Sequence, residues 1–166
     1  MTKPRVLVLH ATGTNRDREA AWAASAAGGI PRIMHVNELR QRVGCLHDYQ
    51  MLILPGGFSY GDALGAGRLW AVDLRWLFEQ ELARFIESGK PVLGICNGFQ
   101  ALVKSGWLPG PPADGVRATL TRNASNRFEC RWVWLAPDAE SRCVVTRSAS
   151  EMILCPVAHG EGRFVP

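Results

Sequence analysis

The chain has 166 residues, of which 47% are hydrophobic and 20% are charged, so it is long enough for one globular domain with one core. Its formal charge is only +4, and the basic residues are scattered rather than gathered in a stripe or motif for nucleic acid. This composition excludes disordered and fibrous proteins and argues against nucleic-acid binding. The longest apolar stretches are strand-sized, which argues against a membrane span. With five cysteines, no C-x-x-C pair and no signal peptide at residues 1–9, we expect free thiols and a cytoplasmic protein.

The first half of the chain alternates predicted strands and helices. Residues 5–9 form an apolar run that ends at turn residues, which predicts a buried strand. Residues 17–27 are rich in alanine and stop at two glycines, which predicts a helix. A strand, a short helix and another strand are predicted next: residues 30–36, 37–43 and 51–54.

The alternation continues beyond a glycine-rich loop at residues 56–67. Apolar residues recur with helical spacing from Leu69 to Ile86, which predicts one helix that ends at Gly89. A fourth strand is predicted at residues 91–95 and a further helix at residues 97–105. This pattern predicts an α/β protein with a flavodoxin-like, mostly parallel sheet and helices on both of its faces.

The last third of the chain has a different character. A proline-rich stretch at residues 109–112 is interpreted as a loop inside a single domain of residues 1–166. Downstream, four predicted strands follow one another without helices, so we expect a small antiparallel section: residues 118–121, 128–135, 143–146 and 151–157. Residues 159–166 are predicted to be a loop.

Cys96 stands between the fourth predicted strand and the helix that follows, in the segment Gly94-Ile-Cys-Asn-Gly98. A nucleophile on such a tight strand-to-helix turn needs small neighbours two residues away on each side. The helix N-terminus also favours a thiolate. Most free cysteines are simply small buried hydrophobic residues, and we interpret the other four in that way. The two flanking glycines favour a nucleophile at Cys96.

The loop Pro55–Asp62 directly follows the third predicted strand. In a parallel sheet it lies at the same carboxyl edge as Cys96, so its backbone N–H groups can point toward the thiol. A glycine-rich turn alone is weak support, because glycine is common in loops. Two such loops at one edge, one of which carries a cysteine, indicate an active site.

Four segments closely resemble the glutaminase subunits of phosphoribosylformylglycinamidine synthase, a family of class I glutamine amidotransferases. They are LPGGFSYGD (54–62), GKPVLGICNGFQ (89–100), RNASNRFECRWV (122–133) and PVAHGEGRF (156–164). The loop at residues 13–17 is also similar to the first loop of that family. The resemblance runs through nearly the whole chain.

The resemblance implies glutamine hydrolysis through a cysteine thioester, with Cys96 as nucleophile. It implies an oxyanion hole from the backbone N–H of Asn97 and that of Gly57 or Phe58, and a glutamine pocket that includes Gly56 and Gln100. The ammonia would serve a synthetase subunit that converts formylglycinamide ribonucleotide to formylglycinamidine ribonucleotide in purine synthesis. ATP and Mg would bind that partner, a small accessory subunit can take part, and no cofactor or metal is expected on this chain.

The chain departs from the family in the catalytic triad. The family takes its histidine and glutamate from a Pro-His-Pro-Glu motif downstream of the His-Gly-Glu-Gly loop, and this chain lacks that motif. His159, Gly160 and Glu161 match the earlier loop, which implies glutamine binding. We therefore expect further residues beyond Pro166. A short form in which His159 and Glu161 take over the triad roles is the alternative.

Two other functions stay open at this point. A stand-alone cysteine hydrolase of the peptidase or deglycase type also carries a cysteine on a flavodoxin-like sheet, and a docking subunit without catalysis would lack a general base. Gln100 and the downstream motifs count against the first function, whereas the missing triad motif leaves the second open. Arg122, Asn123 and Arg127 either stabilise their loop or lie near the glutamine pocket or a partner interface.

Overall fold

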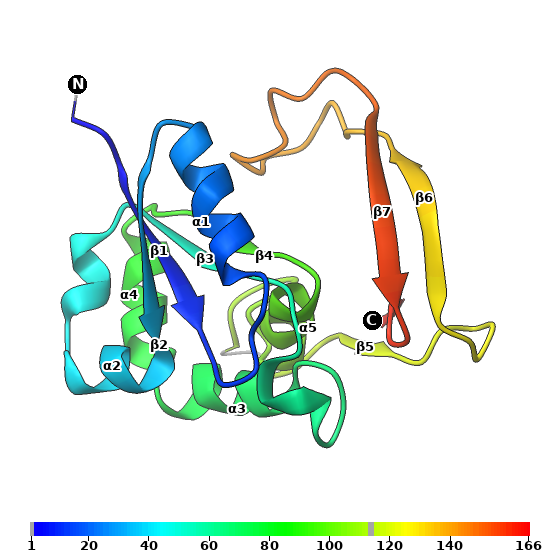
Figure 1. Ribbon diagram of the computed structural model, residues 1–166, viewed down its shortest axis with the longest axis horizontal. Helices are drawn as coiled ribbons and strands as arrows, with labels where there is room; N and C mark the ends of the chain where they lie inside the picture. The colour runs from blue at the N-terminus through cyan, green and yellow to red at the C-terminus, as the bar shows by residue number, and fades with distance from the viewer. Residues whose placement is uncertain (1, 113–114) are drawn as a thin grey trace. The chain divides into compact units, whose positions relative to one another are not determined.

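The computed structural model describes residues 2–112 and 115–166, and the chain divides into two compact units (Figure 1). Unit 1 is Met1–Leu120 with Phe164–Pro166, and unit 2 is Thr121–Arg163. The single domain expected from the sequence stays a prediction. Among the described residues no helix is long and apolar enough to span a membrane.

Unit 1 is built on a four-stranded sheet in the order β2-β1-β3-β4. Every neighbouring pair in this sheet is parallel, as the alternation of strands and helices predicted. The strands are β1 (Arg5–His10), β2 (Ile30–His35), β3 (Met51–Leu54) and β4 (Val92–Gly94).

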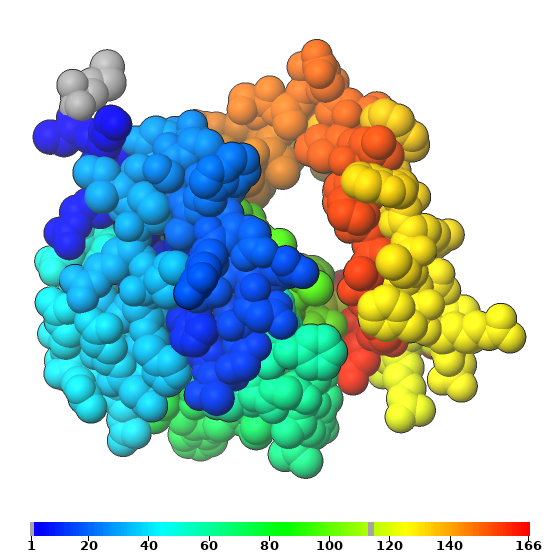
Figure 2. All heavy atoms as spheres, in the orientation of Figure 1, coloured from blue at the N-terminus to red at the C-terminus, as the bar shows by residue number. Residues whose placement is uncertain are grey.

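Helices cover both faces of this sheet, because the side chains of its strands alternate between two buried clusters. Val6 and Val8 pack with Ala20 of α1 (Asp17–Ala26) on one face. Leu7 and Leu9 belong to the larger cluster on the other face. That cluster is closed by α2 (Val36–Gln41), α3 (Arg68–Trp76), α4 (Glu79–Glu87) and α5 (Asn97–Lys104). In Figure 2 the segments from β1 to α2 (blue to cyan) pack against one another. The predicted flavodoxin-like layering is confirmed.

The single long helix predicted between Leu69 and Ile86 is wrong, because the chain breaks it into α3 and α4 at Leu77 and Phe78. Trp76, Leu77 and Phe78 are consecutive large apolar residues, and one helical stripe cannot bury all three. The break turns Phe78 inward, where it is 4% exposed, and leaves Trp76 79% exposed. Two short helical turns, η1 (Cys45–Asp48) and η2 (Ser59–Asp62), complete the connections of this unit.

The antiparallel section predicted for the last third is confirmed by β6 (Glu129–Leu135) and β7 (Ile153–His159), which form a two-stranded ribbon in unit 2. The strand predicted at residues 143–146 is wrong. The backbone turns there, with Thr146 N–H donating to the Cys143 carbonyl at 3.1 Å. Val144 and Val145 favour a strand by propensity, but they are exposed and the local turn satisfies the backbone instead.

The predicted final loop is also only partly correct. It contains the short strand β8 (Arg163–Val165), which pairs with β5 (Thr119–Thr121) in a second two-stranded sheet. Pairing with a strand far away in sequence leaves little local signal, so the sequence pattern could not predict it.

Candidate functional site

Cys96 lies on a strained turn between β4 and α5, with φ 50° and ψ −110°. A positive φ is unfavourable for a residue with a side chain, and such strain concentrates at functional sites. The cysteine is exposed. Gly98 sits two residues later, where an added Cβ would lie 2.0 Å from the carbonyl oxygen of Leu54. The tight turn expected from the glycine spacing is therefore present, and Gly98 leaves no room for any side chain.

Three segments meet at the carboxyl edge of the sheet: the Cys96 turn, the loop with Gly56 and Gly57, and the first loop with Asn15. Ile95 N–H donates to the Leu54 carbonyl at 3.0 Å, which keeps the ends of β3 and β4 side by side. A Cβ on Gly56 would lie 3.2 Å from the Cys96 Cβ. Gly57 has φ +127°, and its added Cβ would lie 2.5 Å from the backbone nitrogen of Asn15 in the first loop. The structure thus brings the loop with Gly56 and Gly57 against the Cys96 turn between β4 and α5, which we call the elbow, as the topology predicted.

Asn97 and Gln100 are buried on the first turn of α5. The Asn97 side chain accepts a hydrogen bond from Ser59 N–H at 3.2 Å and donates to Asp62 Oδ1 at 2.7 Å. It also donates to Gln100 Oε1 at 3.2 Å. From the sequence only the backbone N–H of Asn97 was assigned a role. Because two of its partners, Ser59 and Asp62, lie far away along the chain, no local pattern could have indicated the role of its side chain.

His159 is held by one side chain inside unit 2, that of Asn123. The His159 Nδ1 lies 2.9 Å from Asn123 Oδ1, which also accepts from Gly162 N–H at 2.9 Å. The Asn123 Nδ2 donates to the carbonyls of His159 and Arg127, both at 2.8 Å. An amide oxygen only accepts, so Nδ1 of His159 donates the hydrogen of this contact and Nε2 is the other ring nitrogen. Of the two roles that the sequence left open for Asn123, the structure supports loop stabilisation.

The histidines of unit 1 are engaged on other elements. His10 Nδ1 pairs with Asp17 at 2.9 Å. His35 Nδ1 accepts from the Asn37 N–H at 3.1 Å and caps α2. His47 packs against the ring of Phe85. None of these contacts recruits a histidine to the Cys96 turn.

The other cysteines differ in their ionisation. The backbone N–H of Val145 holds the pKa of the exposed Cys143 thiol below its usual range. Burial raises the pKa of the Cys45 thiol. Cys143 is therefore expected to compete for simple alkylating reagents, which the sequence did not indicate. Within residues 2–112 and 115–166, no group of three or more His, Cys, Asp or Glu side chains is placed to hold a metal ion.

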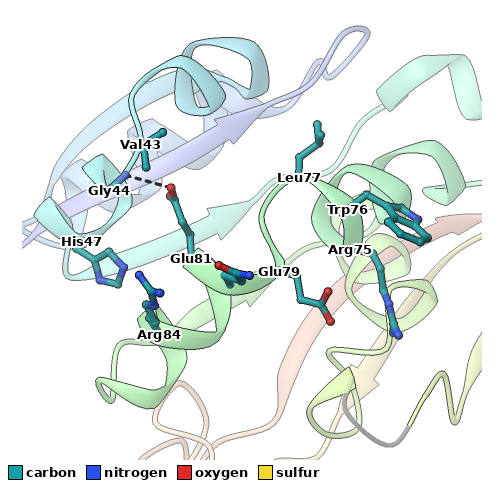
Figure 3. Close-up of a pocket in the computed structure, with 10 residues that line it drawn as sticks. Val43, Gly44, His47, Arg75, Trp76, Leu77, Glu79, Glu81 and Arg84 are labelled. Atoms are coloured by element: carbon teal, nitrogen blue, oxygen red, sulfur yellow. Dashed lines mark hydrogen bonds between the residues drawn. The ribbon is translucent and has the colours of Figure 1, made fainter.

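A cavity of about 410 Å³ lies between the turn at residues 43–47 and the α3–α4 corner (Figure 3). Glu81 of α4 accepts a hydrogen bond from Gly44 N–H at 3.0 Å, which connects α4 to the turn at residues 43–47. Trp76 and Leu77 line the same cavity and are exposed. None of the residues predicted for the glutamine site lines this cavity, so its lining shares no residue with that site.

Residues 3–166 match the family described as CobB/CobQ-like glutamine amidotransferase domain. The chain is 52% identical to phosphoribosylformylglycinamidine synthase subunit PurQ of Treponema denticola, with 98% of this chain and 64% of that protein covered. It is 48% identical to the subunit of the same name from Dehalococcoides mccartyi, with 99% and 64% covered. The chain thus spans about 64% of the length of these curated relatives.

Solved structures show the same fold. A chain in the structure of PurLQS from Thermotoga maritima is similar with a TM-score of 0.77 and 36% identity, over 99% of this chain and 70% of that one. A glutamine amidotransferase from Thermotoga maritima has a TM-score of 0.55 at 16% identity, over 99% of this chain and 64% of that one, which supports the fold alone.

Proposed function

The chain belongs to the CobB/CobQ-like glutamine amidotransferase family, and from this we propose that it hydrolyses glutamine at Cys96 and supplies ammonia to a synthetase subunit. The relatives at 52% and 48% identity carry the name of a phosphoribosylformylglycinamidine synthase subunit. The proposed acceptor is accordingly formylglycinamide ribonucleotide, which the synthetase converts to formylglycinamidine ribonucleotide with ATP and Mg of its own. The proposed setting is purine synthesis in the cytoplasm. The observation that carries the proposal is the exposed, strained Cys96 beside the glycine loop of β3.

The proposed reaction begins with attack of the Cys96 thiolate on the carboxamide carbon of glutamine. The carbonyl oxygen becomes an oxyanion, which the backbone N–H of Asn97 and that of Gly57 or Phe58 would stabilise. One such donor contributes roughly 3–4 kcal/mol in other acyl-transfer enzymes. The amide nitrogen takes a proton and leaves as ammonia, so a γ-glutamyl thioester remains. Water then attacks the thioester, releases glutamate and restores the thiol.

Glutamine-binding residues are proposed in each unit. Gly56 and Gln100 lie beside the elbow and suit the carboxamide end. The segment His159-Gly160-Glu161 suits the α-amino and α-carboxylate groups. Because Asn123 fixes the orientation of His159, this histidine offers a fixed Nε2 for one hydrogen bond to substrate.

None of the residues assigned above has the role of transferring protons at Cys96. The histidines of unit 1 are engaged elsewhere, and His159 is assigned to binding. Loss of a general acid–base group slows turnover by about two to four orders of magnitude.

The function is tested by mixing the chain with its cognate synthetase subunit, ATP, Mg and formylglycinamide ribonucleotide. The expected result is glutamine-dependent product formation that needs this chain, above the rate with synthetase alone. Cys96→Ala should abolish the glutamine-dependent reaction and leave the reaction with added ammonium salt intact. Product formation from glutamine with Cys96→Ala would overturn the role of this cysteine. No stimulation of the synthetase, with hydrolysis of unrelated esters or amides instead, would favour the stand-alone hydrolase.

A further inference from the structure

The turn η2, which directly follows Gly57 and Phe58, has an unusual backbone. Tyr60 (φ 57°, ψ 24°), Gly61 (φ 62°, ψ 22°) and Asp62 (φ 52°) are consecutive left-handed residues. For residues with a side chain this conformation costs roughly 1–2 kcal/mol each, and it occurs mostly at single positions. A run of three, two of which carry side chains, persists only where surrounding contacts hold it.

Four side chains from other elements and from the turn itself supply these contacts. Thr14 Oγ1 and Ser59 Oγ lie 2.8 Å apart, and both residues are buried. The Tyr60 hydroxyl donates to the Asp73 carboxylate of α3. Burial, followed by this hydrogen bond, raises the pKa of the Tyr60 phenol, so it stays a donor. These contacts anchor the turn to the first loop and to α3, but none of them connects it to the elbow.

Asn97 is the side chain that makes the connection to the elbow. It is 1% exposed, and it follows the strained Cys96 directly. Its Oδ1 accepts from the N–H that opens the turn, that of Ser59, and its Nδ2 donates to Asp62 Oδ1 at the end of the turn. One amide therefore bridges both ends of the strained turn to the first residue of α5.

We propose that Asn97 is a positioning residue, which clamps the Ser59–Asp62 turn to the elbow and thereby holds the N–H groups of Gly57 and Phe58 beside Cys96. The inference rests on the proposed glutaminase function. Phe58 is coupled to the turn through its carbonyl, which accepts from Gly61 N–H at 2.9 Å. Release of the clamp lets the left-handed turn relax, and the peptide between Gly57 and Phe58 moves with it. A donor displaced by about 1 Å can cost a hundredfold in rate.

The clamp can be tested by exchanging the amide and the carboxylate between residues 97 and 62. Asn97→Asp keeps an acceptor for Ser59 N–H but places two carboxylates against each other, at residues 97 and 62. The double variant Asn97→Asp with Asp62→Asn restores one donor and one acceptor across the same 2.7 Å contact. Gln100 can turn its amide to donate to the new carboxylate. The exchange therefore separates the hydrogen bond from the identity of either residue.

The measurement is inactivation of the chain by a chloroketone analogue of glutamine, with the limiting rate and the half-saturating concentration determined separately. Iodoacetamide serves as the control reagent, because its displacement reaction needs no oxyanion hole. Rates of both reagents with Cys96 are taken on the alkaline plateau, so that a changed thiolate fraction does not contribute. Ser105→Ala is the matched control, since it removes a buried hydrogen bond to the Leu102 carbonyl at the far end of α5.

The proposal expects Asn97→Asp to lower the limiting chloroketone rate about ten- to a hundredfold, with the iodoacetamide rate at Cys96 nearly unchanged. The double variant should recover most of the lost chloroketone rate. Ser105→Ala should lower the melting temperature without changing either rate. Wild-type chloroketone rates in Asn97→Asp would overturn the proposal. So would equal slowing with both reagents without recovery in the double variant, which is the behaviour of a purely structural residue. A wild-type chain that the chloroketone leaves untouched while iodoacetamide labels Cys96 would instead overturn the proposed function.

Discussion

The elbow at Cys96 in unit 1 and the loop at His159 in unit 2 are held in different ways. The elbow rests on a parallel sheet, and backbone packs directly on backbone where Gly98 meets Leu54. The His159 loop follows a two-stranded ribbon and is fixed by hydrogen bonds of Asn123, from its side-chain amide and from its backbone N–H, which donates to the Gly160 carbonyl. The two regions should therefore be sensitive to different substitutions. The elbow should not tolerate an added side chain, and the loop should not tolerate the loss of one amide.

The largest effect is expected for Gly98→Val. Its Cβ would lie 2.0 Å from the Leu54 carbonyl oxygen, so β3 and α5 must separate. Overpacking of this kind costs about 3 kcal/mol or more. We expect a lower urea midpoint and no chloroketone labelling of Cys96.

The matched substitution in the other region is Gly160→Ala, where an added Cβ would find only the Phe128 ring at 3.9 Å. It should leave the urea midpoint nearly unchanged. If Gly98→Val unfolds at the wild-type midpoint and still labels at Cys96, the contrast between the two regions is wrong.

Asn123→Ala should have the next largest effect, and it should be confined to unit 2. The substitution removes the hydrogen bonds to the carbonyls of Arg127 and His159 and those from His159 Nδ1 and Gly162 N–H. Their combined net contribution is about 2–4 kcal/mol. Amide hydrogen exchange should speed up in β6 and β7 and stay slow in β1 and β3. Equal acceleration in both units would show that Asn123 does not act locally.

His159→Ala should have a smaller effect, of the kind that distinguishes binding from proton transfer. A residue that holds glutamine equally in the ground and transition states raises KM and leaves kcat nearly unchanged. We expect KM for glutamine to rise about tenfold, which corresponds to about 1.4 kcal/mol. Glutamate release is measured in the complex with the synthetase. A loss of two or more orders of magnitude in kcat at saturating glutamine would identify His159 as the general base instead.

The smallest effect concerns the thiols outside the elbow. The pKa of Cys143 is lowered by the Val145 N–H, whereas that of Cys45 is raised by burial. Iodoacetamide should therefore modify Cys143 at a pH where Cys45 is still protonated, and the Cys45 reaction should appear only as the pH rises further. Peptide mapping after brief alkylation at several pH values checks the order. Earlier reaction of Cys45 would contradict it.

The elbow was predictable because its constraints are local. A strand of apolar residues, two glycines around Cys96 and a helical pattern all lie within residues 91–105. The break between α3 and α4 was missed because spacing alone did not show that three consecutive apolar residues exceed one helical face. The turn at residues 143–146 was missed because strand propensity does not show whether a neighbouring strand exists.

The hydrogen bonds of the Asn97 and Asn123 side chains could not be predicted from the sequence for a different reason. Asn97 meets Asp62 across 35 positions of sequence, and Asn123 meets His159 across 36. Each pair depends on how distant segments come together. Asn97 had been assigned only through its backbone, and Asn123 only as one of several polar residues in a loop.

Covalent labelling by a glutamine chloroketone tests whether Cys96 is the nucleophile toward glutamine. The chain is incubated with the reagent and digested, and the modified cysteine is located by mass spectrometry. The account predicts modification of Cys96 alone, protection by glutamine, and no modification in Cys96→Ala. Exposed Cys143, with its lowered pKa, is the built-in competitor. Labelling of Cys143 in place of Cys96, or unchanged labelling in Cys96→Ala, would contradict the account.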